Sequence, residues 1–146
     1  MKVNFRLALL DDVPSIIELC NECFFENTSL EYAINSFKNT MNSPNDIYLV
    51  GEVDDKIIAH SKITIIETMY EKMNVYAILN HVCVKEEYRR HNIATLMLKE
   101  IERICRLKKV KTMELWSNNV RVPAHACYKK YGFGLDDAGF FSKPVE

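Results

Sequence analysis

Apolar positions along the first 24 residues change from a strand pattern to a helix pattern. Over residues 3–8 apolar and polar side chains alternate, which predicts a strand. Between residues 13 and 24 the apolar positions recur at helical spacing, and Pro14 stands where the first turn of a helix tolerates proline. Because aspartate accepts hydrogen bonds from the first N–H groups of a helix, we expect Asp11 or Asp12 to cap this one.

The middle of the chain predicts a second helix followed by three strands. A weaker helical pattern runs over residues 29–39 and ends before a polar loop. Two stretches rich in β-branched residues, 47–53 and 56–67, meet at Asp54-Asp55 and predict a hairpin. The segment 75–84 is rich in Val, Ile and Tyr, which predicts a buried strand.

The last third predicts two helices and two strands. An apolar stripe over 93–105 is the strongest helical pattern, and a short strand is predicted over 111–117. Pro123 opens another helix, Gly132 ends it, and two phenylalanines near the C-terminus predict a final strand. The order β-α-α-β-β-β-α-β-α-β predicts an α/β (α+β) fold with a β-α-β crossover around residues 93–105.

Length and charge narrow the classes of function. A chain of 146 residues predicts one domain over 1–146, and 48% hydrophobic with 27% charged residues is typical of a soluble globular protein. The net charge of -1 argues against a nucleic-acid partner held by bulk positive charge. That total hides a division, because residues 1–84 hold 6 basic and 12 acidic side chains whereas residues 85–111 hold 9 basic and 4 acidic ones. The division suits an anionic ligand near 85–111 and a cationic one near the N-terminal half.

The N-terminus and the cysteines predict a cytoplasmic protein without a membrane partner. Residues 1–12 lack the basic start and apolar run of a secretory signal, and no apolar run approaches the ~20 residues that cross a bilayer. Five cysteines without framework spacing predict reduced thiols. The pair Cys20-x-x-Cys23 continues a helical stripe and has no second Cys or His pair at ligand spacing, so we expect no metal.

The segment 82–94 joins the buried strand to the strongest helix and suits an anion. A helix N-terminus offers N–H groups without an acceptor and a partial positive charge. Arg89 and Arg90 add two charges there, and Asn92 and Ala94 allow a ligand to approach the backbone. A solvated charged loop before a surface helix explains the same residues equally well.

This segment resembles the acyl-CoA loop of the GNAT superfamily of N-acetyltransferases. The family pattern Arg/Gln-x-x-Gly-x-Gly/Ala reads here as Arg89-x-x-Asn92-x-Ala94. Asn92 replaces the first glycine, and asparagine tolerates a positive φ better than other non-glycine residues, so we expect the loop to survive.

A second stretch in the right order and spacing resembles the same family. The family commonly shows Ala-x-x-x-Tyr-x-x-x-Gly-Phe, found here as Ala124, Tyr128, Gly132 and Phe133. The opening Arg6-x-Ala8-x-x-x-Asp12 is also similar to the family's first strand and helix. The resemblance therefore covers nearly the whole chain and implies a GNAT-like mixed central sheet with splayed strands.

The resemblance implies an acetyl-CoA-dependent N-acetyltransferase. The expected reaction is direct transfer of an acetyl group, in a ternary complex, from acetyl-CoA to a primary amine of a small molecule. Two alternatives remain open: a non-catalytic acyl-CoA-binding or regulatory module on this fold, and an acetyltransferase of a protein N-terminus or lysine. Members of the family often pair through edge strands, so a homodimer is one expected state.

The resemblance also implies which residues hold acetyl-CoA. The strand before the loop is expected to part from its neighbour and to present backbone groups to the pantetheine arm, while the loop and the C-terminal segment supply further contacts. The expected cofactor-binding residues are Val82, Cys83, Val84, Arg89, Arg90, His91, Asn92, Ile93, Ala94, Asn119 and Tyr128.

Acetyl transfer needs an acid for the leaving thiolate and a base for the ammonium group of the acceptor. Tyr128 is the expected general acid, since a phenol can donate a proton to a thiolate.

The base departs from the family pattern, because many relatives carry Glu where this chain has Asn80-His81. His81 is the candidate base, with Asn80 beside it as a residue that could order a water. Successive strand residues face opposite ways, so both can face one pocket only if the strand bulges. Glu114 and His60 are the alternatives.

The acceptor is expected between the first helices and the hairpins, over residues 21–43 and 64–75. Acidic side chains in these segments could attract a cationic amine, although solvated surface charge explains them as well. They are Glu22, Glu26, Glu31, Glu67 and Glu71. A small amine or amino sugar is the first expectation for the substrate, and a peptide N-terminus or lysine is the second.

Overall fold

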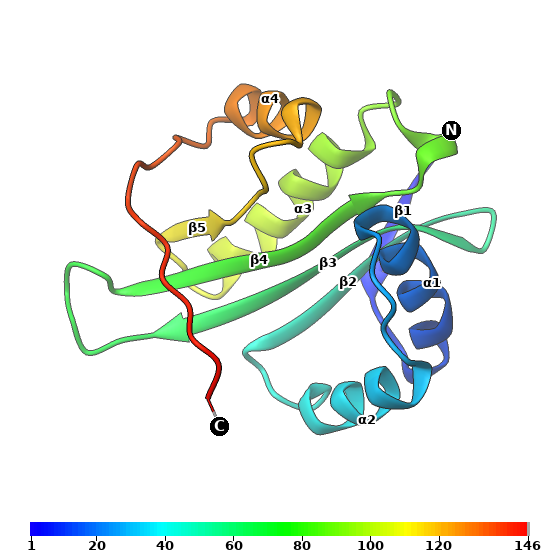
Figure 1. Ribbon diagram of the computed structural model, residues 1–146, viewed down its shortest axis with the longest axis horizontal. Coiled ribbons are helices and arrows are strands. Elements are labelled where there is room, and N and C mark those ends of the chain that lie inside the picture. Colours follow the sequence, from blue (N-terminus) through cyan, green and yellow to red (C-terminus); the bar gives the residue numbers. More distant parts are fainter. Residues whose placement is uncertain (146) are drawn as a thin grey trace. The chain divides into compact units, whose positions relative to one another are not determined.

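Five strands form one mixed sheet whose spatial order follows the chain, β1-β2-β3-β4-β5 (Figure 1). The computed structural model describes residues 1–145. Neighbouring strands are antiparallel from β1 to β4, whereas β4 and β5 are parallel. The strands are β1 (Asn4–Leu7), β2 (Asp46–Val53), β3 (Lys56–Glu67), β4 (Val75–Val84) and β5 (Thr112–Leu115). A parallel pair needs a crossover connection, and a helix supplies it between β4 and β5.

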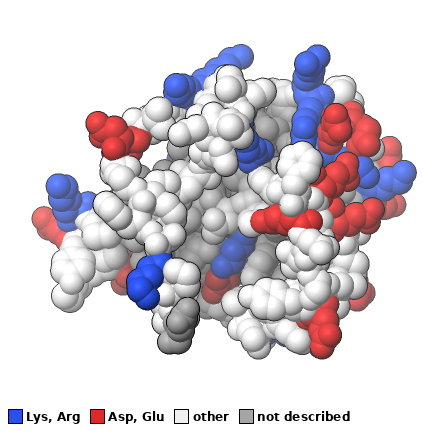
Figure 2. All heavy atoms as spheres, in the orientation of Figure 1, with Lys and Arg blue, Asp and Glu red and all other residues white. Residues whose placement is uncertain are grey.

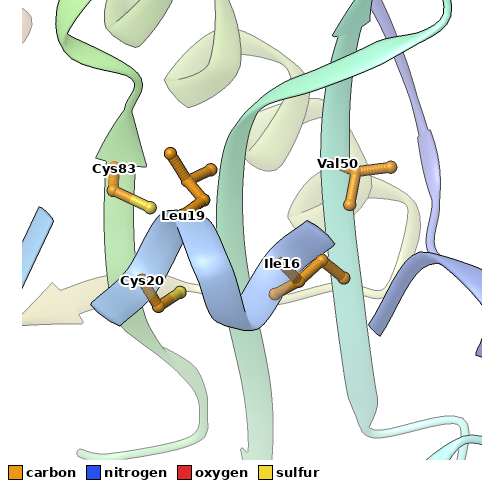
Figure 3. Packing of buried hydrophobic residues seen from close by; sticks show 5 residues of the cluster. All are labelled: Ile16, Leu19, Cys20, Val50 and Cys83. Atoms are coloured by element: carbon orange, nitrogen blue, oxygen red, sulfur yellow. The ribbon is translucent and has the colours of Figure 1, made fainter. Parts of the chain in front are cut away.

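Helices cover both faces of this sheet. The helices of the chain are α1 (Val13–Phe24), α2 (Leu30–Thr40), α3 (Ile93–Leu107) and α4 (Val122–Tyr131), with single 3-10 turns at η1 (Leu10–Asp12) and η2 (Glu86–Tyr88). α1 and α2 lie on one face of the sheet and α3 lies on the other (Figures 1 and 3). Among the described helices, none is both long enough and apolar enough to cross a membrane.

The chain divides into two compact units, Met1–Trp116 and Ser117–Glu146. The first unit contains the sheet with α1, α2 and α3, and the second contains α4. Gly132 ends α4 with a φ of 123°, a backbone conformation that glycine adopts without a steric penalty. The expectation of a single domain over 1–146 stays a prediction.

The apolar stripe of α1 packs directly on the sheet (Figure 3). Ile16, Leu19 and Cys20 of α1 contact Val50 of β2 and Cys83 of β4, and all five are nearly fully buried. Burying a large aliphatic side chain stabilises a fold by about 1.5–3 kcal/mol, so this cluster fixes α1 against β4. A smaller cluster joins α1 to α2 and contains Val13, Ala33 and Phe37.

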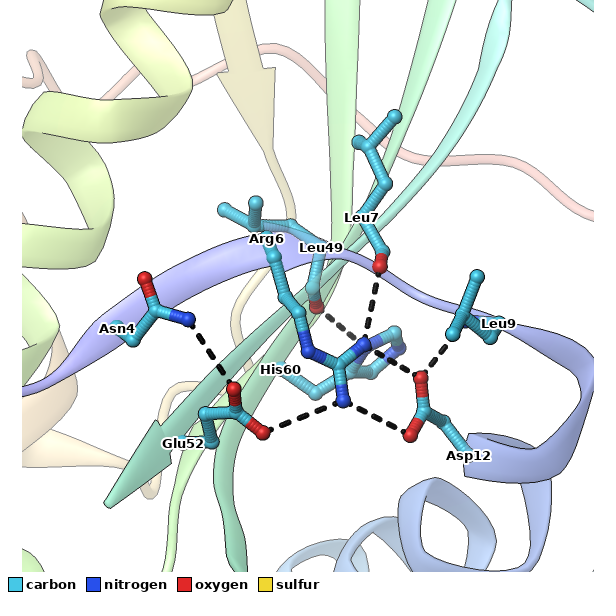
Figure 4. A network of polar contacts seen from close by, with 8 residues as sticks. All are labelled: Asn4, Arg6, Leu7, Leu9, Asp12, Leu49, Glu52 and His60. Carbon is cyan, nitrogen blue, oxygen red and sulfur yellow. Dashed lines mark hydrogen bonds and ion pairs between the residues drawn. The ribbon is translucent and has the colours of Figure 1, made fainter. Parts of the chain in front are cut away.

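An ion-pair network ties β1 to the start of α1 (Figure 4). Arg6 binds both carboxylate oxygens of Asp12, at 2.7 and 3.0 Å, and reaches Glu52 of β2 at 3.3 Å. The hydrogen bond from Arg6 holds the pKa of the Asp12 carboxyl below its usual range. Asp12 stands at the N-cap position of α1, but its side chain accepts from Leu9 N–H at 2.7 Å and makes no capping bond to the helix. The expectation that Asp12 caps α1 through its side chain is therefore wrong.

The prediction of a final strand at Phe140 and Phe141 is wrong. Both side chains are exposed, by 69% and 94%, and the described residues after α4 contain no helix or strand. Aromatic residues favour strands only where a neighbouring strand and a core can take up the side chains. The other predicted helices and strands form, with ends that shift by a few residues.

Candidate active site

The two halves of β4 are paired differently. Residues 76–79 pair with β3 on one edge and with β5 on the other, and the last pair with β5 joins Leu79 to Leu115. The second half, residues 80–84, pairs only with β3. This confirms the expected parting of β4 from its neighbour, and it leaves one backbone edge of residues 80–84 without a strand partner in the described sheet.

A β-bulge interrupts the pairing of β3 with β4 at the start of this second half. His60 pairs with Cys83 and Lys62 pairs with Asn80, so one residue of β3 lies opposite two residues of β4. His81 has a φ of 53°, and both Asn80 and His81 have exposed side chains. A bulge redirects side chains that would otherwise alternate. Asn80 and His81 consequently face the same pocket, as adjacent strand residues can do only where the strand bulges.

This pocket lies between the helix pair and the sheet, within the first unit. Its volume is about 310 Å³, and its walls come from α1, the loop after it, α2 and three strands. The lining residues are Val13, Ile16, Ile17, Cys20, Glu26, Thr28, Tyr32, Ala33, Ser36, Phe37, Tyr48, His60, Lys62, Asn80 and His81. The pocket therefore includes residues of the expected acceptor stretch 21–43 together with the candidate base, whereas no residue of the expected stretch 64–75 is among those that line it.

His81 is hydrogen-bonded to Glu26, which lies in the loop after α1. The Nε2 atom of His81 is 2.9 Å from Glu26 Oε1 and 3.1 Å from Oε2. Carboxylate oxygens accept hydrogen bonds, so Nε2 carries the hydrogen and donates it to Glu26. In the neutral ring Nδ1 then holds the lone pair. The ring edge also contacts Phe24, with centroids 4.9 Å apart. This arrangement orients the imidazole as a carboxylate orients a catalytic histidine.

His60 lines the same pocket in a different environment (Figure 4). Its side chain is 4% exposed, and its Nδ1 donates to the backbone oxygen of Leu49 at 2.8 Å. Burial lowers the pKa of His60 to about 4, with a smaller contribution from His81. His60 is therefore neutral at physiological pH, which makes it a much weaker base than an ordinary histidine. Glu114, the other alternative, lies on β5, where it pairs with Ile78 of β4, and it is not among the residues that line the pocket.

Lys62 is the basic residue of the lining, and its charge is already compensated. Its Nζ donates to Asp46 Oδ1 at 2.6 Å and to Thr64 Oγ1 at 3.0 Å. The ion pair with Lys62 lowers the pKa of the Asp46 carboxyl. Nζ also lies 5.5 Å from the centre of the Tyr48 ring.

The loop after β4 has the backbone that its asparagine predicts. Asn92 adopts a left-handed φ of 63° immediately before α3, and Arg90 has a φ of 66°. The first helical hydrogen bond runs from Leu96 N to Asn92 O at 3.1 Å, so the preceding N–H groups have no acceptor within the helix. N–H groups of this kind can bind a phosphate, and the phosphate contacts expected of Arg89 and Arg90 stay predictions.

Arg89 is exposed, and its guanidinium turns back toward the end of β4. Its Nε donates to Val84 O at 2.9 Å, and its Nη2 lies 3.6 Å from the sulfur of Cys23 at the end of α1. The Nδ1 atom of His91 donates a hydrogen bond to the backbone oxygen of Arg89 at 3.0 Å. Arg89 thus fixes the path of the loop, and its part in holding a cofactor stays a prediction.

Cys23 has an unusual thiol. A hydrogen bond from Cys83 and the neighbouring Arg89 lower the pKa of Cys23 to about 6. Hydrogen bonds with Cys20 and Cys23, together with burial, raise the pKa of Cys83. Within the described residues, no group of three or more His, Cys, Asp or Glu side chains could hold a metal ion.

Several expected cofactor contacts are restricted to backbone atoms. The side chains of Cys83 and Ile93 are 3% and 2% exposed, so only their main-chain groups are open to a ligand. In the second unit, Tyr128 of α4 packs edge-on against Phe133 with centroids 5.9 Å apart. Asn119 lies in the segment before α4. The roles given to Tyr128 and Asn119 stay predictions.

A comparison with protein-family models matches residues 13–133 to the family described as "Acetyltransferase (GNAT) family". The chain belongs to this GNAT family. The family uses acetyl-CoA as acetyl donor, in agreement with the resemblance found in the loop and α4. No curated protein matches the chain.

Solved structures with the same fold match this GNAT chain over nearly its whole length. A predicted acetyltransferase from Clostridium acetobutylicum, described with acetyl-CoA, is 20% identical and has a TM-score of 0.79. The match covers 97% of this chain and 96% of that protein. A glucosamine-6-phosphate N-acetyltransferase from Arabidopsis thaliana is 16% identical, with a TM-score of 0.82 and full coverage of both chains. An aminoglycoside acetyltransferase from an uncultured soil metagenomic sample is 15% identical, with a TM-score of 0.82. The match covers 99% of this chain and 97% of that protein.

Sequence reasoning did not assign Glu26 to His81 or Lys62 to the pocket. Glu26 appears in the sequence only as one of several acidic side chains in the acceptor region, 55 positions before His81. The alternation of β3 places Lys62 on the same face as His60 and Thr64, which was the available signal for Lys62.

Proposed function

We propose that this GNAT protein is an acetyl-CoA-dependent N-acetyltransferase whose acceptor is the primary amine of a small molecule, with direct transfer in a ternary complex. The observation that carries the proposal is the second half of β4. It begins at a pocket that contains a histidine–carboxylate pair, presents an open backbone edge, and continues into a loop that suits a pyrophosphate. Two of the similar structures are described as N-acetyltransferases or acetyltransferases of amino sugars, which supports a small-molecule acceptor.

His81 is the proposed base. An alkylammonium group must lose a proton before it can attack, since its ordinary pKa is near ~10.4. With Nε2–H held by Glu26, the lone pair of Nδ1 accepts this proton, and the nearby carboxylate stabilises the imidazolium that forms. Glu26 is a positioning residue in this scheme. Asn80, which lines the same pocket, is proposed to hold a water that relays the proton.

Acetyl-CoA supplies the activated acetyl group as a thioester when it is bound. The unpaired edge of residues 80–84 would hold its pantetheine arm through main-chain groups. The first turn of α3, with Arg89 and Arg90, would hold its phosphates. Tyr128 is the proposed acid that protonates the leaving thiolate, on the strength of the family pattern alone.

Release of free thiol from acetyl-CoA, measured across a panel of primary amines, tests this proposal. We expect turnover by the native protein and a loss of about 10²–10⁴-fold in kcat/KM for His81→Gln, in line with the removal of a general base. Tyr128→Phe should lower kcat by a larger factor than it weakens the binding of acetyl-CoA.

Glu114→Gln is the matched control, because Glu114 lies outside the pocket lining, and it should retain full activity. Calorimetry that detects no binding of acetyl-CoA would overturn the proposal. Binding without turnover of any amine would instead favour a non-catalytic acyl-CoA-binding module.

A further inference from the structure

The walls of the acceptor pocket are chiefly apolar. One face of α1 contributes aliphatic side chains, and α2 adds Ala33 and Phe37. The Phe37 and Tyr48 rings lie side by side with centroids 4.9 Å apart. The Tyr48 hydroxyl is already hydrogen-bonded to Thr40 at 2.6 Å, so Tyr48 offers a ligand mainly its ring. The apolar walls suit an apolar ligand body, because any ligand hydroxyl that they leave without a partner costs about 1–3 kcal/mol.

The charges of the lining favour a single cation. Glu26 is the acidic residue among the described lining residues, and Lys62 is the basic one. The charge of Lys62 is neutralised by Asp46, at 2.6 Å, so it is poorly suited to bind a phosphate or carboxylate of a substrate. Figure 2 shows acidic side chains gathered over the part of this face that carries α1 and the β2–β3 turn, which also favours approach of a cation.

The volume of the pocket favours a compact molecule. Pockets for small ligands usually measure about 300–1,000 Å³, and this one, at about 310 Å³, is at the lower end. A single aromatic ring on a short chain is of this size, whereas an aminoglycoside of several linked rings is not.

We propose that the acceptor of this protein is a monoamine on a compact apolar body, preferably aromatic, and not an amino sugar. The inference rests on the proposed function, since it names the substrate class of the same pocket. The ammonium group lies toward Glu26 and His81, and the ring packs between the aliphatic face of α1 and the Phe37–Tyr48 pair.

Kinetics with 2-phenylethylamine, glucosamine 6-phosphate and an aminoglycoside test the class of acceptor. We expect kcat/KM for 2-phenylethylamine to exceed both others by at least about tenfold. 2-Phenylethanol, which keeps the apolar body and lacks the charge, should inhibit competitively against the amine. Equal or faster acetylation of either sugar would overturn this inference and leave the proposed N-acetyltransferase function standing.

Variants at two exposed tyrosines locate the apolar contact. Tyr32 lines the pocket and is 69% exposed, so Tyr32→Ser should fold normally while raising the KM for 2-phenylethylamine about three- to tenfold. Tyr70, 59% exposed in the loop after β3, is not among the residues that line the pocket, so Tyr70→Ser is the matched control and should leave KM unchanged.

Calorimetry of 2-phenylethylamine binding, without acetyl-CoA, gives a readout that does not depend on turnover. Binding that weakens in Tyr32→Ser and not in Tyr70→Ser supports the inference even if acetyl-CoA fails to bind, an outcome that would contradict the proposed function alone. Absence of amine binding in the native protein, together with binding of acetyl-CoA, would contradict the inference alone.

Discussion

The two halves of β4 are predicted as one continuous strand from the sequence, but they differ in pairing and in exposure in the protein. Residues 76–79 are hydrogen-bonded to strands on both edges and carry Ala77 and Leu79, which are nearly fully buried. Residues 80–84 begin with a bulge, have a strand on one edge only, and present Asn80 and His81 to a pocket. Residues 82–84 are buried too, with Cys83 in the core, so the two halves differ at Asn80 and His81, whose exposed side chains lie where pairing with β5 stops. Interrupted pairing is what allows two adjacent side chains to reach one site.

The largest expected effect separates the halves at their boundary. Leu79→Ala should lower the free energy of unfolding by about 2–5 kcal/mol, because Leu79 is 2% exposed and its removal leaves a cavity. Asn80→Ala, one residue further along, should change it by less than about 0.5 kcal/mol. Urea unfolding measures both. Similar losses for the two variants would contradict the difference between the buried Leu79 and the exposed Asn80.

A second expectation concerns His60, which pairs with Cys83 of the second half. Its pKa of about 4 in the folded protein lies below the ordinary value near ~6.5, so the unfolded chain binds more protons between these values. The associated stability is fully present above pH ~6.5 and is lost as the pH falls through 4.

Between pH 7 and pH 4 the native protein should lose roughly 3 kcal/mol more than His60→Gln. Glutamine keeps a donor for Leu49 O and removes the titration. Denaturant unfolding at several pH values measures the difference, and parallel pH profiles for the two proteins would show that His60 does not stay neutral through burial.

A smaller effect is expected at the loop that follows β4. Asn92 has a φ of 63°, which costs an alanine roughly 1–2 kcal/mol. Asn92→Ala should therefore be less stable than the native protein by about 1 kcal/mol, and Asn92→Gly should differ from it by less than that. Thermal unfolding compares the three proteins. An alanine variant as stable as the glycine variant would show that the left-handed backbone is not required.

The smallest effect on stability is expected at Cys23, where the readout is reactivity. Because the pKa of Cys23 is lowered to about 6, its alkylation by iodoacetamide should reach half its maximal rate near pH 6, far below an ordinary thiol. Arg89→Gln removes one cause and should move this midpoint upward. Cys23→Ser identifies the reacting residue by mass spectrometry, and a midpoint near pH 8.5 in the native protein would contradict the assignment.

Much of the framework could be predicted because it depends on local patterns. The bounds of β4 match the predicted 75–84 strand, and the hairpin turn forms at Asp54 and Asp55, both with positive φ. Asparagine at position 92 predicted the left-handed backbone found there. In each case the residue types within a few positions determine the conformation.

The parts that could not be predicted depend on distant partners. Nothing near His81 in the sequence identifies Glu26, which is brought to it by the packing of α1 on β4. Asp12 has the side chain of a helix cap, yet Arg6 and the N–H of Leu9 compete for its oxygens and bind them instead. Phe140 and Phe141 are of a residue type that favours strands, but the described chain forms no strand after α4.

The left-handed backbone of His81 implies a conflict between durability and activity. A histidine at a φ of 53° is held in a conformation that costs non-glycine residues roughly 1–2 kcal/mol, and glycine would remove that strain. Selection for thermal resistance alone would therefore be expected to drift toward glycine at position 81 and to yield a sturdier protein without its proposed base. Histidine at position 81 therefore lowers the stability of the strand while it supplies the proposed base.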